Sequence, residues 1–178
     1  MENTVMEATL SVEQKIALAE RVSAVDVDDL DSFCTERGLQ LNEVTSWSTA
    51  YGTGGKLGVQ ALVVQTRLAP ARLRELKEQV RSALRVYRPR TLRIRDEGNW
   101  FTIEEVKTLS ASSIIYTPFV QLRVVADDEG IDRWFLFWRR AGGSWWPYAS
   151  KTNFANAADA LFEAHADLHR CFRLHPMY

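Results

Sequence analysis

Apolar side chains recur at helical spacing near both ends of the chain. Residues 11–22 carry an apolar stripe, and Ser11 with Gln14 three residues later makes a capping-box pair at the start of this predicted helix. A second helix is predicted over residues 27–37, where aspartates crowd the first turn and favour the positive end of the helix dipole. The pattern predicts a last helix over residues 157–172.

The pattern is less regular in the part of the chain that follows the second helix. Residues 39–51 are weakly strand-like, and the glycine-rich residues 52–58 predict a loop or hairpin. Residues 59–68 predict a strand that is apolar on both faces, which is typical of the interior of a sheet. Pro70 suits the first turn of a helix that continues to about Tyr87.

After that helix the apolar period changes to two, which predicts strands joined by short turns. The predicted strands cover residues 91–95, 100–107, 114–126, 131–140 and 145–149. The even positions of the third strand are all apolar and predict a core-facing side, while Pro118 predicts a bulge or an edge location. Because short turns join the consecutive strands, we expect an antiparallel meander.

The order of elements predicts an α+β fold. We expect a single domain over residues 1–178, with a mostly antiparallel sheet of five to six strands and helices packed on one face of it. An N-terminal helical pair and a C-terminal helix complete the prediction. Residues 1–45 are a candidate helical subregion, although no linker marks its boundary.

Charge is distributed unevenly along the chain. The 22 basic and 23 acidic residues give a net charge of −1, which excludes a uniformly basic nucleic-acid binder. Residues 1–45 nevertheless carry a net charge of −7, residues 46–95 carry +9, and residues 96–178 carry −3. We therefore expect a dipolar surface, unless the acidic N-terminal helices fold over the basic segment and neutralise it.

The basic segment is the first candidate binding surface. Four of its cations recur at three- and four-residue spacing on the predicted helix 70–87, and two more project together from the next strand. The candidate basic face consists of Arg67, Arg74, Lys77, Arg81, Arg85, Arg88, Arg90, Arg93 and Arg95. Such a face fits an acidic protein partner or a row of phosphates, and a solvated helix face is the simplest alternative.

The second candidate surface is an aromatic hairpin near residue 140. Its candidate binding residues are Trp134, Trp138, Arg139, Arg140, Trp145 and Trp146. Strand 131–140 has large apolar side chains on both faces, so either a helix covers the second face or aromatic rings are exposed there. Packing in the core is the more common role of such residues.

Motifs for catalysis are weak. Gly55 and Lys56 are followed by leucine instead of serine or threonine, so the segment does not match a phosphate-binding P-loop. Glu105 and Lys107, with Asp96 upstream, resemble half of the pattern of the PD-(D/E)xK nucleases, which makes a metal-dependent nuclease a third candidate. We expect no cofactor and no metal, and we favour a role without catalysis.

Histidine and cysteine give no stronger signal. His165 and His169 would share a helical face, but a half-buried core histidine is the simpler interpretation of His165. Cys34 and Cys171 are widely separated in the sequence, and we expect both to be buried thiols without a disulfide, as in a reducing compartment.

The sequence predicts a function only as a class. Residues 1–10 have no basic run and no apolar core, and no apolar stretch is long enough to span a bilayer, so we expect a cytoplasmic protein without membrane contact. We predict a small soluble protein-interaction module of the inhibitor, immunity, adaptor or chaperone type, acting through the basic face or the aromatic hairpin. A nucleic-acid-binding protein that uses the basic strip 67–95 is the alternative.

Overall fold

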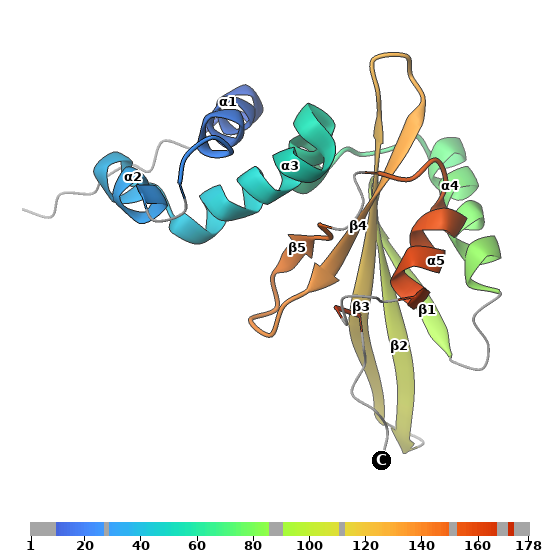
Figure 1. Cartoon of the computed structure of the whole chain (residues 1–178). Coiled ribbons are helices and arrows are strands. Elements are labelled where there is room, and N and C mark those ends of the chain that lie inside the picture. Colours follow the sequence, from blue (N-terminus) through green and yellow to red (C-terminus); the bar gives the residue numbers. More distant parts are fainter. Residues whose placement is uncertain are drawn as a thin grey trace, which may run out of the picture.

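The computed structural model describes residues 10–26, 29–85, 91–110, 113–149, 153–166 and 171–172. Five helices and a five-stranded sheet confirm the α+β prediction, with an N-terminal helical pair and a C-terminal helix (Figure 1). The elements are α1 (Val12–Val22), α2 (Leu30–Arg37), α3 (Leu41–Val63), α4 (Pro70–Leu84), β1 (Leu92–Glu97), β2 (Trp100–Ser110), β3 (Ser113–Ala126), β4 (Asp132–Arg139), β5 (Trp145–Pro147) and α5 (Ala157–Ala166). No described helix is long and apolar enough to cross a membrane.

The sheet is the predicted antiparallel meander, with its strands side by side in chain order. A bulge lies in β3 at the predicted place, because Ile103 pairs with Val120 whereas Glu104 pairs with Pro118. Phe119 is the extra residue of this bulge, and one extra residue exchanges the two faces of a strand.

Because of this bulge, the prediction that all even positions of β3 face the core is only partly correct. Val120, Leu122 and Val124 are buried, as predicted, but Ile114 and Tyr116 are exposed. Both lie on the far side of the bulge, where the even positions have changed face. The alternation of apolar residues is unbroken in this part of the sequence, so the sequence does not show that the two faces of the strand change places at the bulge.

One face of the sheet packs on α4 and α5, as predicted for helices on one face. Phe101, Leu122 and Leu136 lie side by side on this face and form a core with Leu76 of α4 and Leu161 of α5. The predicted start of the helix at Ala157 is also confirmed. Figure 1 shows both helices on the same side of the sheet.

The end of α3 covers part of the opposite face. Ala61 forms a buried cluster there with Phe135 and Phe137 of β4. The second apolar face of β4 is therefore covered by a helix at this point, which decides between the two alternatives that the sequence left open.

The predicted strands 39–51 and 59–68 and the loop 52–58 are wrong, because most of this region is helical and forms the two halves of α3 on either side of a kink at Gly55. Val44, Trp47 and Ala50 are buried at helical spacing. Gly55 bends the helix with a backbone φ of 56°. Gly58 lets the two halves approach, since a Cβ atom at this position would overlap the carbonyl oxygen of Ala50.

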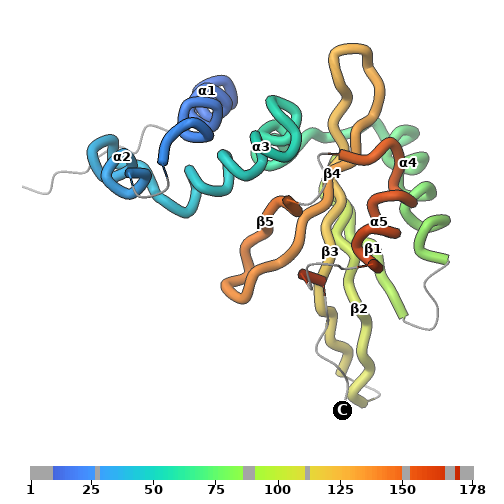
Figure 2. The backbone as a smooth tube through the Cα atoms, in the orientation of Figure 1, coloured from blue at the N-terminus to red at the C-terminus, as the bar shows by residue number. Residues whose placement is uncertain are grey.

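The N-terminal helices form a hydrophobic cluster of their own. Ala19 of α1 and Cys34 of α2 pack against Val44 and Trp47 in the first half of α3. Figures 1 and 2 show α1 and α2 beside α3 and α2 away from α4, while the first turn of α1 lines a cavity together with Arg72 and Leu76 of α4. Among the described residues no ion pair joins α1 or α2 to α4, so the acidic helices do not neutralise the basic helix.

Candidate binding site at the β4–β5 hairpin

Acidic residues of the same chain form ion pairs with most of the cations on α4. Lys77 pairs with Asp96 of β1. Arg81 and Arg85 lie 2.5 and 3.2 Å from the two carboxylate oxygens of Glu78, and the hydrogen bond from Arg81 is the main cause that lowers the pKa of Glu78. The predicted stripe on the helix is therefore largely an intramolecular network of ion pairs.

Arg93 and Arg95 project together from β1, as predicted, but toward the face opposite α4. Both point to Glu104, whose side chain is only 7% exposed; the Nε atoms of Arg93 and Arg95 lie 3.7 and 3.0 Å from its oxygens. Their neighbours Leu92 and Ile94 pack in the core against α4. Because successive residues of a strand face opposite sides, the predicted basic face is divided between the two sides of the sheet.

The remaining basic candidates are few. Arg67 and Arg74 are exposed and have no ion pair among the described residues. Arg88 and Arg90 lie outside the described residues.

The aromatic candidates divide into core residues and a pair that contacts Arg140. Trp134 is buried, and its ring centroid lies 5.8 Å from that of Phe101. Trp145 packs against the buried cluster beneath α3. Trp138 and Trp146 form a half-buried cross-strand pair at the end of the hairpin.

Arg140 stacks on this tryptophan pair. Its guanidinium carbon lies 4.4 Å from the ring centroid of Trp146 and 6.0 Å from that of Trp138. Stacking on an aromatic face orients the planar guanidinium and leaves its edge available for an anion.

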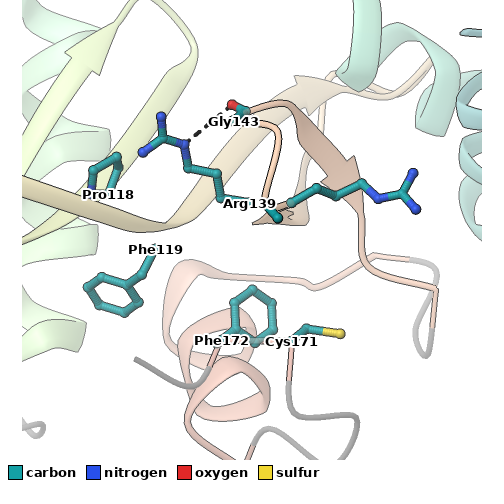
Figure 3. A pocket seen from close by; sticks show the side chains of 8 residues that line it. Pro118, Phe119, Arg139, Gly143, Cys171 and Phe172 are labelled. Atoms are coloured by element: carbon teal, nitrogen blue, oxygen red, sulfur yellow. Dashed lines mark hydrogen bonds between the residues drawn. The ribbon is translucent and has the colours of Figure 1, made fainter. Parts of the chain in front are cut away.

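A pocket of about 300 Å³ lies beside this hairpin (Figure 3). Its lining residues are Pro118, Phe119, Arg139, Arg140, Ala141, Gly143, Cys171 and Phe172. Among the described residues the lining thus contains two arginines and two phenyl rings but no carboxylate. Neither Arg139 nor Arg140 forms an ion pair with any described residue, in contrast to Arg81 and Arg85 at the end of α4 and to Arg93 and Arg95 of β1.

The hairpin turn and the bulge build this pocket. The amide of Arg140 donates to the carbonyl of Ser144 over 2.9 Å, and Gly143 adopts a φ of 85° that favours glycine. Arg139 Nε donates to the carbonyl oxygen of Gly143 over 3.3 Å (Figure 3). The bulge adds Phe119 to the lining, so the pocket walls come from β3, the hairpin turn and the residues that follow α5.

A larger cavity of about 490 Å³ lies where the N-terminal helices meet the sheet. It is lined by Val12 of α1, by the segment before α4 and by the charged pair Arg72 and Asp132. Glu13 of α1 also lines this cavity. The lining thus contains two carboxylates, and its arginine already binds Asp132, which makes the hairpin pocket the stronger candidate for an anionic ligand.

The nuclease residues do not assemble a metal site in the described part of the chain. Glu105 and Lys107 share a face and lie 3.4 Å apart, as their spacing predicted. Asp96 pairs with Lys77 and lies four register positions from Glu105, which is about 13 Å at the usual rise of a strand. No three metal-ligating side chains come together among the described residues.

His165 is exposed, so the prediction of a half-buried histidine is wrong. The buried stripe of α5 runs through Ala157, Ala160 and Ala164, and His165 is one step of about 100° away from Ala164. His169 lies outside the described residues. Neither cysteine forms a disulfide, as predicted; Cys34 is buried and Cys171 is partly buried.

A comparison with protein families matches residues 61–173, which include every residue that lines the hairpin pocket. The chain belongs to the DUF3024 family. This family is described as a domain of unknown function. No curated protein and no solved structure matches the chain.

The match begins at Ala61, in the last turn of α3. The DUF3024 region thus contains α4, α5 and the whole sheet, whereas α1, α2 and most of α3 precede it. The separate hydrophobic cluster of these helices lies outside the matched region.

The sequence predicts only part of this site. It indicates Arg139, Arg140 and the two tryptophans on which Arg140 stacks, but it does not indicate Phe119, Cys171 or Phe172. Pro118 was a usable signal for the bulge that places Phe119. No local signal could bring Phe172 to the hairpin, because that contact depends on how α5 packs on the sheet.

Proposed function

We propose that this DUF3024 protein is a cytoplasmic protein-interaction module whose β4–β5 hairpin binds an acidic segment of a partner protein. The observation that carries the proposal is the pair Arg139 and Arg140, which lines a pocket with two phenyl rings and with no carboxylate among the described lining residues. Elsewhere in the DUF3024 region most described arginines bind acidic residues of the chain itself.

The lining of the pocket supports a ligand with two kinds of groups. Guanidinium groups bind carboxylates through paired hydrogen bonds, and the stacked Arg140 is already oriented for such contacts. Phe119 and Phe172 offer an apolar wall to a ring or an aliphatic side chain. A volume of about 300 Å³ is at the lower end for small-molecule sites, so we expect it to accommodate one or two side chains of a peptide.

Nucleic acid is a weaker proposal for this site. A duplex or single-strand binder neutralises a row of phosphates with a row of cations. On α4, Glu78 and Asp96 pair with Lys77, Arg81 and Arg85. The described cations without an ion pair, such as Arg74 and the hairpin arginines, therefore do not form one continuous row.

The ligand class can be tested by fluorescence anisotropy with the full chain at about 0.15 M ionic strength. One probe is a labelled peptide of alternating glutamate and phenylalanine; its control replaces each glutamate by glutamine. A second probe is a labelled oligothymidylate. We expect the acidic peptide to bind and the other two probes to bind at least about tenfold more weakly.

Two results would overturn this proposal. Tight binding of the oligothymidylate with a steep salt dependence, together with weak binding of the peptide, would establish the nucleic-acid alternative. Equal binding of the glutamate and glutamine peptides would show that the arginines do not recognise carboxylates.

A further inference from the structure

The hairpin formed by β2 and β3 contains a long uncharged segment. Residues 108–122 include no acidic or basic side chain, and Lys107 and Arg123 stand at its two ends. In a chain with 45 charged residues among 178, fifteen consecutive uncharged positions are unusual for a surface segment. Isoleucine, tyrosine and threonine in the centre of this segment favour extended structure.

Large apolar side chains of this hairpin are exposed. The exposed fractions are 66% for Leu109, 51% for Ile114, 44% for Ile115 and 44% for Tyr116. They lie close together at the end of the hairpin, which extends beyond β1 and β4 in Figure 1. Because successive side chains of a strand alternate between its faces, apolar side chains are exposed on both faces at this end of the hairpin. Exposed apolar clusters of this kind mark interaction sites.

The outer edge of the same segment has no partner strand in the described part of the chain. β4 pairs with β3 only over residues 120–126, so residues 113–119 pair with β2 alone. An open edge presents backbone amide and carbonyl groups that can bind another strand. The opposite edge of the sheet, β1, differs because it carries Arg93, Arg95 and Glu97.

We infer that residues 113–117 of β3 pair antiparallel with the same residues of a second copy of this chain. The result is a two-fold symmetric dimer in which the two sheets become continuous. Antiparallel pairing of a strand with itself has this symmetry, because each residue then meets a residue of the same short segment. The inference concerns a surface separate from the arginine pocket and holds whether or not that pocket binds a peptide.

The absence of charge favours a second copy over a different protein. In a symmetric pair, any charged residue near the two-fold axis faces its own like charge, which destabilises the pair. Residues 113–117 contain no such charge, and cross-strand pairs of isoleucine and tyrosine stabilise a ladder. Within residues 113–117 a charged partner strand would find no complementary side chain. The neighbouring charges belong to β1 and β2, where Arg93 lies 4.5 Å from the ring centroid of Tyr116 and Lys107 pairs in register with Ile115.

The bulge limits the length of the pairing. Pro118 has no amide hydrogen to donate, and the extra residue Phe119 interrupts the regular ladder. Pairing therefore stops before β4 begins and cannot extend along the whole strand. Five residues from each copy form a small interface, so we expect a dissociation constant of about 1–100 μM instead of an obligate dimer.

Sedimentation velocity of the full chain over a concentration series tests the dimer. We expect the mass to rise from 20.3 kDa toward twice that value as the concentration passes through the micromolar range. Ile115→Lys places two like charges at the interface and should raise the dissociation constant at least about tenfold. Ile131→Lys is the matched control, because it changes an equally exposed isoleucine in the β3–β4 turn and should leave the dimer intact.

Crosslinking gives a second test that does not depend on the folding of the lysine variant. A single cysteine at Ile115, in a Cys171→Ser background, should form a disulfide-linked dimer on mild oxidation, because Ile115 meets its own copy at the two-fold axis; Ile131→Cys should not. Ile114 faces Tyr116 of the second copy, so the double variant Ile114→Cys and Tyr116→Cys should also form a crosslinked dimer. A chain that remains monomeric over the series would overturn the inference. So would a dimer that Ile115→Lys leaves intact, or the absence of a crosslink with cysteine at position 115.

Discussion

Arg123 joins the N-terminal helices to the DUF3024 sheet. Its guanidinium lies between the rings of Trp100 and Phe137, 3.9 and 4.0 Å from their centroids. Its Nη1 atom donates to the carbonyl oxygens of Ala61 and Leu62 over 3.1 and 2.6 Å, at the negative end of α3. Burial lowers the pKa of Arg123 to about 9, so the side chain stays charged at neutral pH.

We predict that Arg123→Met destabilises the protein by about 2–4 kcal/mol. Methionine keeps apolar contact with the two rings but leaves the carbonyl oxygens of α3 and the Oε1 atom of Gln121 without their donor. Urea unfolding at neutral pH measures the loss. Arg74→Met, at an exposed position, should change the stability by less than about 0.5 kcal/mol, and an equal loss in both variants would contradict this role of Arg123.

At the scale of elements, the β3–β4 turn depends on one carboxylate. Asp127 accepts hydrogen bonds from the amides of Ile131 and Glu129 and from Arg133 Nε over 2.8–3.1 Å. The hydrogen bond from the Ile131 amide is the largest cause that lowers the pKa of Asp127. A carboxylate with a lowered pKa contributes stability above its ordinary pKa, and this contribution is lost as the pH falls through the lowered value.

We therefore predict that the stability difference between the wild type and Asp127→Asn depends on pH. The wild type should be more stable at neutral pH, and the difference should shrink as acid protonates Asp127. Thermal unfolding of both proteins between neutral pH and the acid range measures it. A difference that stays constant down to acid pH would show that the charge of Asp127 does not stabilise the turn.

The elements with a regular period could be predicted from the sequence, and α3 could not. Strands β1 to β5 and helix α4 each have one apolar period and clear turn or proline signals, so the structure confirms them. In α3 the glycines between Gly52 and Gly58 resemble a loop locally. Their role follows only from the packing of the two halves of the helix across Gly55 and against the carbonyl of Ala50.

The candidate site, like the fold, could be predicted from the sequence only in part. The arginines and tryptophans of the β4–β5 hairpin stand next to each other in the sequence, so composition alone could identify them. Phe119 depends on a bulge, and Phe172 packs 5.2 Å from Tyr148 through tertiary structure. The sequence predicts the basic strip as one surface, because sequence periodicity does not show that Arg93 and Arg95 both pair with Glu104.

At the scale of the molecule, carboxylates close to α4 compensate part of its positive charge. The acidic helices α1 and α2 pack on α3, and Glu78 and Asp96 pair with Lys77, Arg81 and Arg85, whereas Arg74 has no ion pair among the described residues. The uncompensated charge that lines a pocket is instead at Arg139 and Arg140. We therefore propose that the ligand binds at the hairpin and that the α4 arginines have a structural role.

Binding of the labelled glutamate–phenylalanine peptide to two charge-reversal variants tests this account most directly. One variant carries Arg139→Glu and Arg140→Glu, and the other carries Arg81→Glu and Arg85→Glu. We predict that the hairpin variant binds at least about a hundredfold more weakly than the wild type, whereas the α4 variant stays within about twofold. Loss of binding in the α4 variant with full binding in the hairpin variant would contradict the account.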